Sequence, residues 1–196
     1  MLIFPKEASP ILRVMSIDPG TRTLGIAIWE VDITSLKRSI VFSHTLKTDK
    51  MTANYELVVE AHGEKMARLK AIEDELVYFM QEFRVGYVVS ESPYFRRMVT
   101  AFQALVECIL VIRNAVLRYN PFVEFHMIDP SSVKNAVGVK GGSSDKSLMQ
   151  KAVLKEFSDQ VGPGVDLLLS DEHAIDAIAV GKAFLKRIQL WESTNT

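Results

Sequence analysis

The stretch from Val14 to Ile28 constrains the fold most, because two short apolar runs flank a turn that begins with an acidic residue. Runs of this length and composition are typical of β-strands. Pro19 and Gly20 follow Asp18 directly and end the first strand abruptly. The turn therefore fixes one carboxylate at the end of an ordered strand, where a metal ion or a phosphate can approach. Taken alone, the stretch is also compatible with a polar hairpin turn that has no further role.

The apolar patterns along the chain predict an α/β fold with a five-stranded mixed sheet flanked by helices. Three strands in close succession indicate an antiparallel meander, and we expect them at residues 12–17, 24–31 and 39–46. The second has a face of small residues, Gly25 and Ala27, that admits close packing. Apolar residues three or four apart predict one long helix from Tyr55 to Phe83, with Gly63 as a possible weak point.

The second half of the chain alternates strands and helices. Strands are expected at residues 87–91 and 122–128, the last two of the sheet. Helices are expected at 96–119, 131–137, 144–157 and 171–187. The 196 residues are sufficient for one domain, and we expect a core of about 12–188 with tails at 1–10 and 190–196.

Composition limits the class of protein. The lone cysteine, Cys108, excludes an internal disulfide, suits a reducing cytosol and lies in an apolar helix, where a core role is expected. No apolar stretch approaches the length needed to span a bilayer, and the first ten residues lack the apolar core of a secretory signal. The sequence therefore predicts a cytoplasmic protein with no membrane partner.

Charge is unevenly distributed along the chain. The net charge of −1 argues against a protein that coats nucleic acid indiscriminately. Residues 131–155 nevertheless have a local balance of +4 and residues 92–118 one of +3, whereas residues 56–82 have one of −4. This pattern is expected when one face meets a polyanion, and solvated helix faces would also produce it.

Two further acidic positions accompany Asp18. Glu91 ends the fourth expected strand, and Pro93 then prevents a central strand from continuing. If the first and fourth strands are neighbours and parallel, Asp18 and Glu91 emerge at the same sheet edge. Carboxylates that close repel each other unless a cation lies between them, and hard oxygen ligands select magnesium or manganese.

The third acidic position lies on the last expected helix. His173 and Asp176 are three residues apart and share a helix face. Glu172 is four residues from Asp176, so spacing does not choose between it and His173. Asp171 is most simply a helix cap or dipole partner.

The helix at 96–119 is apolar around most of its circumference and must be covered on both sides. One side can pack on the sheet. For the other side we expect a symmetric contact with a second copy, since two-fold dimers dominate homo-oligomers. The residues expected at that interface are Phe102, Leu105 and Ile109.

Four segments together resemble the RuvC-type Holliday junction resolvases, which include phage-borne members. Ile17-Asp18-Pro19-Gly20-Thr21-Arg22, with Gly25 behind it, is similar to their first motif, and Ser90 to Phe95 is similar to their second. Residues 133–147 resemble their DNA-contacting segment. Residues 173–179 resemble their last motif, in the variant with His where other members carry Asp. The motifs are collinear, and the resemblance runs from about Val14 to Phe184.

This resemblance implies a ribonuclease H-like fold and a magnesium-dependent endonuclease. As a homodimer it would cut two opposed strands of a four-way DNA junction, in a bacterial or phage-infected bacterial cell. The catalytic and metal-binding residues would be Asp18, Glu91, His173 and Asp176. They would hold two Mg²⁺ ions, for which Mn²⁺ can substitute, about 3.5–4 Å apart, in a two-metal cleavage.

The resemblance also implies a set of DNA contacts. Lys134 and Lys146 match phosphate-contacting positions, and the glycine-rich segment before Lys146 leads into a helix N-terminus, which favours anions. Tyr94 could stack on or wedge apart bases at the branch point, or merely anchor its proline-containing loop. The expected DNA-binding residues are Tyr94, Arg96, Arg97, Lys134, Lys140, Ser144 and Lys146.

Other functions are compatible with parts of the sequence. A nuclease of the same fold could act on other branched DNA or on RNA. Ile17 to Thr21 also resembles the phosphate-binding turn of sugar and acetate kinases, but those proteins need a second domain and a second glycine-rich motif. A non-catalytic junction-binding module is a third alternative. The four metal-site positions are all filled by residues that can bind a metal ion, which argues against this alternative.

Overall fold

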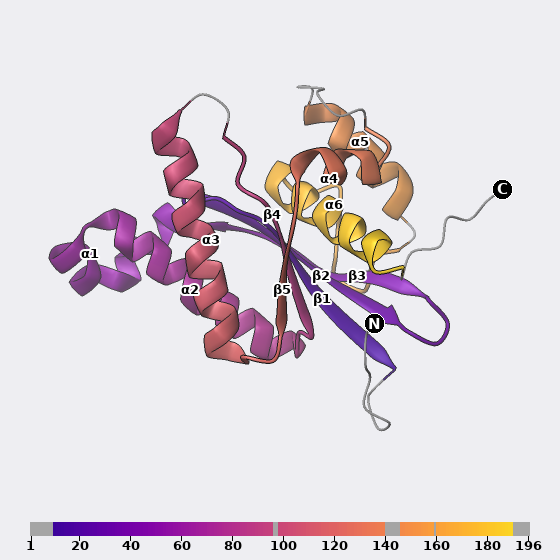
Figure 1. The fold of residues 1–196 in the computed structure, drawn as a ribbon, viewed down its shortest axis with the longest axis horizontal. Coiled ribbons are helices and arrows are strands. Elements are labelled where there is room, and N and C mark those ends of the chain that lie inside the picture. The colour runs from indigo at the N-terminus through magenta and orange to yellow at the C-terminus, as the bar shows by residue number, and fades with distance from the viewer. Residues whose placement is uncertain (1–9, 96–97, 140–145, 159, 190–196) are drawn as a thin grey trace.

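Five strands form one mixed sheet in the computed structural model, which describes residues 10–95, 98–139, 146–158 and 160–189 (Figure 1). Their order across the sheet is β3-β2-β1-β4-β5. The first three strands are mutually antiparallel, whereas β1 pairs with β4, and β4 with β5, in parallel. The predicted mixed sheet is therefore confirmed, with the bounds β1 (Ile11–Asp18), β2 (Thr23–Asp32), β3 (Arg38–Lys47), β4 (Tyr87–Glu91) and β5 (Glu124–Ile128).

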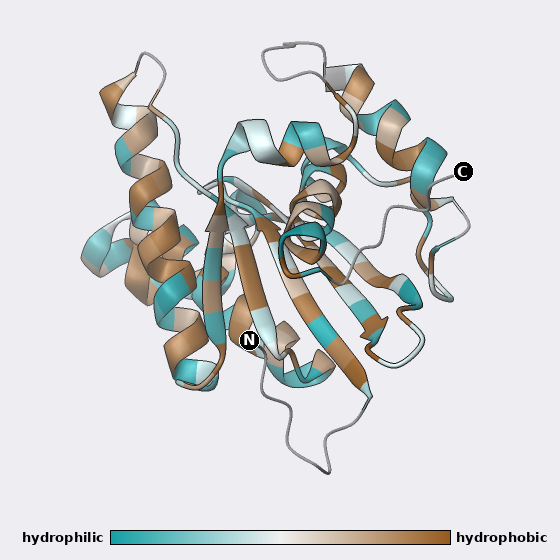
Figure 2. Cartoon of the chain, turned by 45° about the vertical axis from the view of Figure 1, so that its right-hand side comes forward, coloured by the Kyte–Doolittle hydropathy of each residue, from teal (hydrophilic) through white to brown (hydrophobic). Residues whose placement is uncertain are grey.

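Helices cover both faces of the sheet. On one face lie α2 (Glu64–Phe83) and α3 (Val99–Tyr119). On the other lies α6 (Glu172–Arg187), against which α4 (Pro130–Ala136) and α5 (Lys146–Phe157) pack. In Figure 2 hydrophobic segments alternate with hydrophilic ones along the strands, and α3 is mostly hydrophobic.

Alternation along the strands produces two separate core clusters. In β1, Met15 and Ile17 join the cluster under α2 and α3, whereas Val14 joins the cluster under α6. Ser16 shares the side of Val14, because side chains two apart on a strand lie on the same face. The sheet is thus buried on both sides, and the α6 side is the one that Asp18 shares with Ser16.

The predicted single helix from Tyr55 to Phe83 is wrong. The structure divides it at Gly63 into α1 (Glu56–His62) and α2, after two short 3-10 helices, η1 (Thr48–Lys50) and η2 (Thr52–Tyr55). Gly63 has a φ of 83°, a backbone conformation that glycine adopts without strain. Consequently α1 turns away from the axis of α2 and projects from the body of the molecule (Figure 1).

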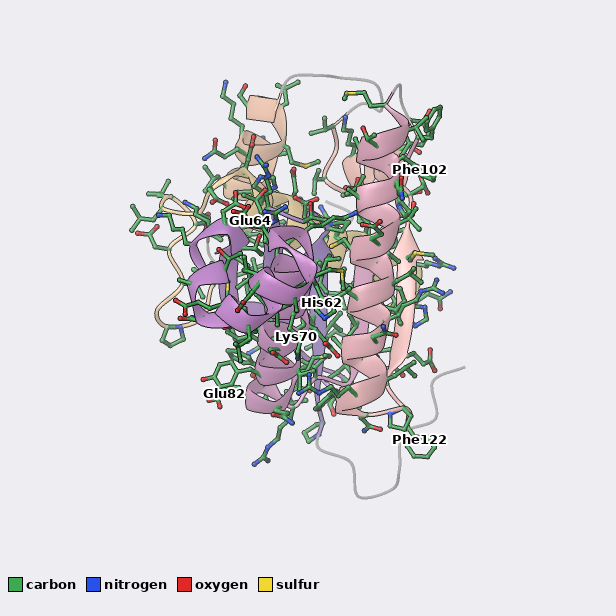
Figure 3. All side chains as sticks on the ribbon, turned by 90° about the vertical axis from the view of Figure 1, so that its left-hand side faces the viewer. His62, Glu64, Lys70, Glu82, Phe102 and Phe122 are labelled. Carbon is green, nitrogen blue, oxygen red and sulfur yellow. The ribbon has the colours of Figure 1, made fainter. Side chains whose placement is uncertain are left out.

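The composition of α3 requires a second correction. By length and composition alone, α3 could span a membrane, contrary to the expectation that no stretch approaches that length. In the structure it packs beside α2 and contributes to the core with Cys108, Ile109, Ile112, Ala115 and Val116. Figure 3 shows α3 beside α1 and α2, with Phe102 near one end and Phe122 just beyond the other. Only 28% of its apolar window is buried within the described structure, so α3 joins the core along one side and leaves the other side uncovered.

Candidate active site

Asp18 and Glu91 end neighbouring parallel strands. The register pairs Ile17 with Ser90, so each carboxylate follows one position beyond a matched pair at the same sheet edge. Val89 lies in the α6-side core, and Glu91, two residues on, shares its face. The condition set out from the sequence, that the first and fourth strands are parallel neighbours, is therefore met. Both acidic residues belong to the face that α6 covers.

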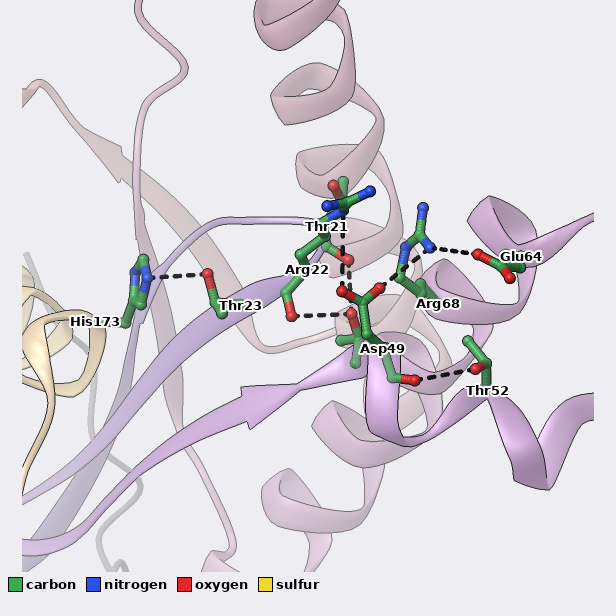
Figure 4. A network of polar contacts seen from close by, with 9 residues as sticks. Thr21, Arg22, Thr23, Asp49, Thr52, Glu64, Arg68 and His173 are labelled. Carbon is green, nitrogen blue, oxygen red and sulfur yellow. Dashed lines mark hydrogen bonds and ion pairs between the residues drawn. The ribbon is translucent and has the colours of Figure 1, made fainter.

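The start of α6 brings His173 into contact with Asp18. Nδ1 of His173 lies 2.8 Å from Oδ2 of Asp18, and Nε2 lies 2.9 Å from the hydroxyl of Thr23. A carboxylate accepts hydrogen bonds without donating them, so Nδ1 carries the hydrogen. The ring is therefore held between the end of β1 and the start of β2; Figure 4 shows its contact with Thr23.

Glycine permits this close approach of helix and strand. A Cβ atom at Gly25 would lie 1.9 Å from the carbonyl oxygen of His173, which is far inside van der Waals contact. Further along α6, a Cβ at Gly181 would lie 2.0 Å from Nε1 of Trp29. The small face predicted for β2 is thus the surface on which α6 rests.

The carboxylate of Asp18 also affects the titration of His173. Its hydrogen bond raises the pKa of the imidazole above the ordinary value, while partial burial acts in the opposite direction. The net effect favours the protonated ring beside the carboxylate.

The residues around His173 divide between capping and the site. Asp171 caps α6, because its carboxylate accepts hydrogen bonds from the Ala174 N–H and the Thr45 hydroxyl. Glu172 is exposed, with its carboxylate 3.9 Å from Nε2 of His173. Of the three residues left open by the sequence, His173 is the one that contacts Asp18. Asp176 follows one turn along α6 and is half-buried.

The donor set suits magnesium or manganese. Carboxylate oxygens are the ligands that these hard cations prefer, and imidazole is a common additional ligand. Within the described part of the chain, no three His, Cys, Asp or Glu side chains already form a group that could hold a metal ion. The contact between Asp18 and His173 is the part of the predicted constellation that the structure brings together, while Glu91 and Asp176 are positioned by β4 and α6.

The architecture is shared with solved structures. No family model matches the sequence, and no curated protein matches it. Thermus thermophilus RuvC in complex with a Holliday junction substrate is 19% identical with a TM-score of 0.65, over 91% of this chain and 98% of that one. The fowlpox virus Holliday junction resolvase is 13% identical with a TM-score of 0.59, and the match covers 90% of this chain and 99% of the viral one. The yeast mitochondrial Holliday junction resolvase is 12% identical with a TM-score of 0.58, and the match covers 91% of this chain and 80% of the yeast one.

The chain has the RuvC fold. The predicted ribonuclease H-like architecture is therefore confirmed, and it extends over nearly the whole chain. In this fold the four segments singled out in the sequence fall at the end of β1, the end of β4, the α4–α5 region and the start of α6.

The expected DNA-binding residues are only partly described. Tyr94 lies after β4 and is 64% exposed, Lys134 lies half-buried on α4, and Lys146 is the first residue of α5. Arg96, Arg97, Lys140 and Ser144 lie outside the described residues.

The predicted dimer residues need one correction. Phe102 and Leu105 are half-buried, but Ile109 is only 5% exposed and lies in the core cluster with α2 and the sheet. Ile109 therefore faces inward in the RuvC fold and is not available to a second copy.

Sequence reasoning missed two threonines that support the turn after Asp18. Thr23 contacts His173, and its position two residues before Gly25 on the same strand face was a usable signal. Thr48 is buried, and its hydroxyl donates to the carbonyls of Thr21 at 2.8 Å and Arg22 at 3.1 Å. No pattern in the sequence distinguishes Thr48 from other threonines.

A cleft of about 690 Å³ lies beside the site, between β3 and residues 164–171. Its charged lining residues are Lys47, Glu75, Asp166 and Asp171. Three acids against one base make this cleft unfavourable for a polyanion.

Proposed function

We propose that this chain is a magnesium-dependent endonuclease that cleaves branched DNA, with four-way junctions as its substrate. Asp18, Glu91, His173 and Asp176 are the proposed ligands of two divalent ions. The observation that carries the proposal is the meeting of Asp18 and His173, 155 residues apart in the chain, at the sheet edge where Glu91 also ends its strand.

The chemistry follows from the ligands. Divalent ions bound here supply an activated water and charge stabilisation for cleavage of a phosphodiester. Asp18 and Glu91 present oxygen ligands from ordered strand ends, which limits the rearrangement needed to bind a cation. His173 offers a nitrogen ligand that leaves the site less anionic than a fourth carboxylate would. That difference favours approach of the negatively charged DNA backbone.

The charge distribution favours one side of the site for DNA. The cleft beside β3 is acidic, whereas α4 follows β5 at the same sheet edge as Asp18 and carries Lys134. Tyr94, after β4, exposes an aromatic ring on that side. We therefore place the DNA over the β4–β5 side, and the remaining proposed contacts are Arg96, Arg97, Lys140, Ser144 and Lys146.

A homodimer would supply two sites for paired incisions. Along α3, Val99, Leu110 and Leu117 are exposed at 67%, 54% and 60%, and Val106 is half-buried. These four positions are separated by seven, four and seven residues, the spacing of an apolar seam along one helix face. Met98, at the start of the same helix, is 67% exposed. This stripe replaces Ile109 in the proposed contact between two copies.

The decisive experiment compares the wild type with Asp18→Asn on four-way, three-way and linear duplex DNA, with magnesium, manganese or EDTA. We expect the wild type to cut four-way junctions with either metal and to be inactive in EDTA. Asp18→Asn should bind junctions but not cut them. Asp166→Asn, an exposed loop residue, is the matched control and should cut like the wild type.

Other outcomes would assign other functions. Cleavage by Asp18→Asn at the wild-type rate would show that the site is wrongly assigned. Junction binding by the wild type without cleavage in either metal would indicate a non-catalytic binding module, and ATP turnover would indicate the kinase-like alternative.

A further inference from the structure

The imidazole of His173 is held from two sides by groups of different character. Asp18 accepts from Nδ1 on one side, and the Thr23 hydroxyl lies 2.9 Å from Nε2 on the other. The hydroxyl can either donate to an unprotonated nitrogen or accept from a protonated one. Thr23 therefore restrains the ring at Nε2, while Asp18 restrains it at Nδ1.

Thr23 itself has little freedom to move. It is the first residue of β2, and its Cα is paired with that of Lys47 on β3. The preceding turn closes on it, because a Cβ at Gly20 would lie 2.1 Å from the carbonyl oxygen of Thr23. The backbone of Thr23 is thus fixed by the turn that also fixes Asp18.

Two positions on one strand face together determine where His173 lies. Thr23 and Gly25 are two residues apart and share the face that α6 covers. Gly25 receives the backbone of His173, and Thr23 contacts its ring. β2 therefore determines both how closely α6 approaches the sheet and how the imidazole of His173 is oriented.

We infer that Thr23 is a positioning residue, which orients the imidazole of His173 toward the cation-binding edge of the sheet; this inference rests on the proposed function. A metal-ligating histidine commonly donates the N–H of its other ring nitrogen to a neighbouring acceptor, which fixes the ring orientation and the tautomer. For His173 that acceptor would be the Thr23 hydroxyl at Nε2, which leaves Nδ1, on the side of Asp18, for the cation. Thr23 belongs to the same turn as Asp18. One short segment therefore aligns two proposed ligands, Asp18 directly and His173 through the Thr23 hydroxyl.

The test uses the full chain with three variants of Thr23 and one control, together with His173→Asn and Asp18→Asn as references. Thr23→Val keeps the shape and the strand preference of threonine but removes the hydroxyl, and Thr23→Ala removes it with a smaller side chain. Thr23→Ser restores the hydroxyl. Thr52→Val is the matched control, because Thr52 is half-buried in η2, away from His173, and its hydroxyl donates to the backbone carbonyl of Asp49 (Figure 4).

Two measurements are made on each variant. Long-range ¹H–¹⁵N spectra report the ring nitrogens of His173, which are identified by their absence in His173→Asn. Calorimetric titration with Mn²⁺ reports the affinity of the site. We expect Thr23→Val and Thr23→Ala to change the ring-nitrogen shifts and to weaken Mn²⁺ binding by about 10-fold or more. Thr23→Ser and Thr52→Val should retain both wild-type properties.

The outcomes separate this inference from the proposed function. Mn²⁺ affinity lowered by Asp18→Asn but not by Thr23→Val or Thr23→Ala would overturn the positioning role and leave the metal site standing. Mn²⁺ affinity unchanged in all of these variants would overturn the metal site itself. Wild-type ring-nitrogen shifts in Thr23→Val would overturn the positioning role whatever the affinity.

Discussion

Close contact between β2 and α6 depends on a single hydrogen atom at Gly25. Any larger side chain there would meet the carbonyl of His173, a backbone atom that cannot rotate away. The helix would have to shift, and with it the imidazole that contacts Asp18. Gly25 therefore determines both how closely α6 packs on β2 and where the imidazole of His173 lies in the site.

We predict that Gly25→Ala lowers the free energy of unfolding by about 2 kcal/mol or more and abolishes cleavage. Gly86→Ala is the control, because a Cβ there would make ordinary contact, 3.4 Å from the nearest atom. Chemical denaturation measures the stability of both variants. Equal stability of Gly25→Ala and the wild type would contradict the close approach.

Cys108 offers a second prediction at this scale. Burial raises the pKa of its thiol to about 12, so very little thiolate is present at pH 8. We expect a disulfide reagent to label Cys108 far more slowly in the native protein than in denaturant. Fast labelling of the native protein would show that α3 does not pack against the sheet as described.

The sequence predicted the positions of the acidic residues better than their contacts. Asp18 and Glu91 were recognisable as strand-end residues, because proline and turn signals follow both. Spacing alone did not choose between His173 and Glu172, and the resemblance to the resolvases pointed to His173. The contact between His173 and Asp18 was not available from the sequence. It depends on the capping of α6 by Asp171 and on the depth allowed by Gly25, which are tertiary features.

The boundaries of strands and helices also differ in how well the sequence predicts them. Every predicted strand is present within two residues of its expected ends, because alternation and turn residues define it locally. The break at Gly63 was not decided by the pattern, since apolar spacing continues through it and a glycine within a helix costs only about 1 kcal/mol. The sequence did not predict the direction in which α1 turns away from α2 at Gly63.

The cap of α4 gives a prediction about pH. Asp129 accepts hydrogen bonds from the hydroxyls of Ser131 and Ser132 and from the Ser132 N–H, which lower the pKa of its carboxyl. Its contribution to stability is present above the unfolded pKa of about 3.9 and is lost as the pH falls toward the lower folded value.

Asp129→Asn keeps a good helix cap but does not titrate. We therefore expect its free energy of unfolding to fall less steeply than that of the wild type between pH 5 and pH 2, as measured by denaturation at each pH. Parallel curves for the two proteins would show that the cap contributes nothing to the acid sensitivity of the fold.

At the scale of the whole molecule, α3 joins the core to the proposed dimer contact. One side of the helix packs under the sheet, and the other presents the stripe that contains Leu110 and Leu117. The sequence predicted that both sides need cover, but not which residues face outward, because nearly all of them are apolar.

We predict that Leu110→Glu converts a dimer into a monomer in light-scattering measurements and removes paired incision while each site still cuts. Leu57→Glu, on the exposed surface of α1, is the control and should remain dimeric. A wild-type monomer would contradict the paired-incision part of the proposal and leave the chemistry of the site unaffected.

The most direct test of the whole account is a crystal structure with Mn²⁺, located by its anomalous scattering. We predict manganese at the sheet edge, bound by the carboxylates of Asp18 and Glu91, with His173 and Asp176 completing the site. Manganese absent from this edge, or the side chains of Asp18, Glu91 and Asp176 directed to separate surfaces, would contradict the account.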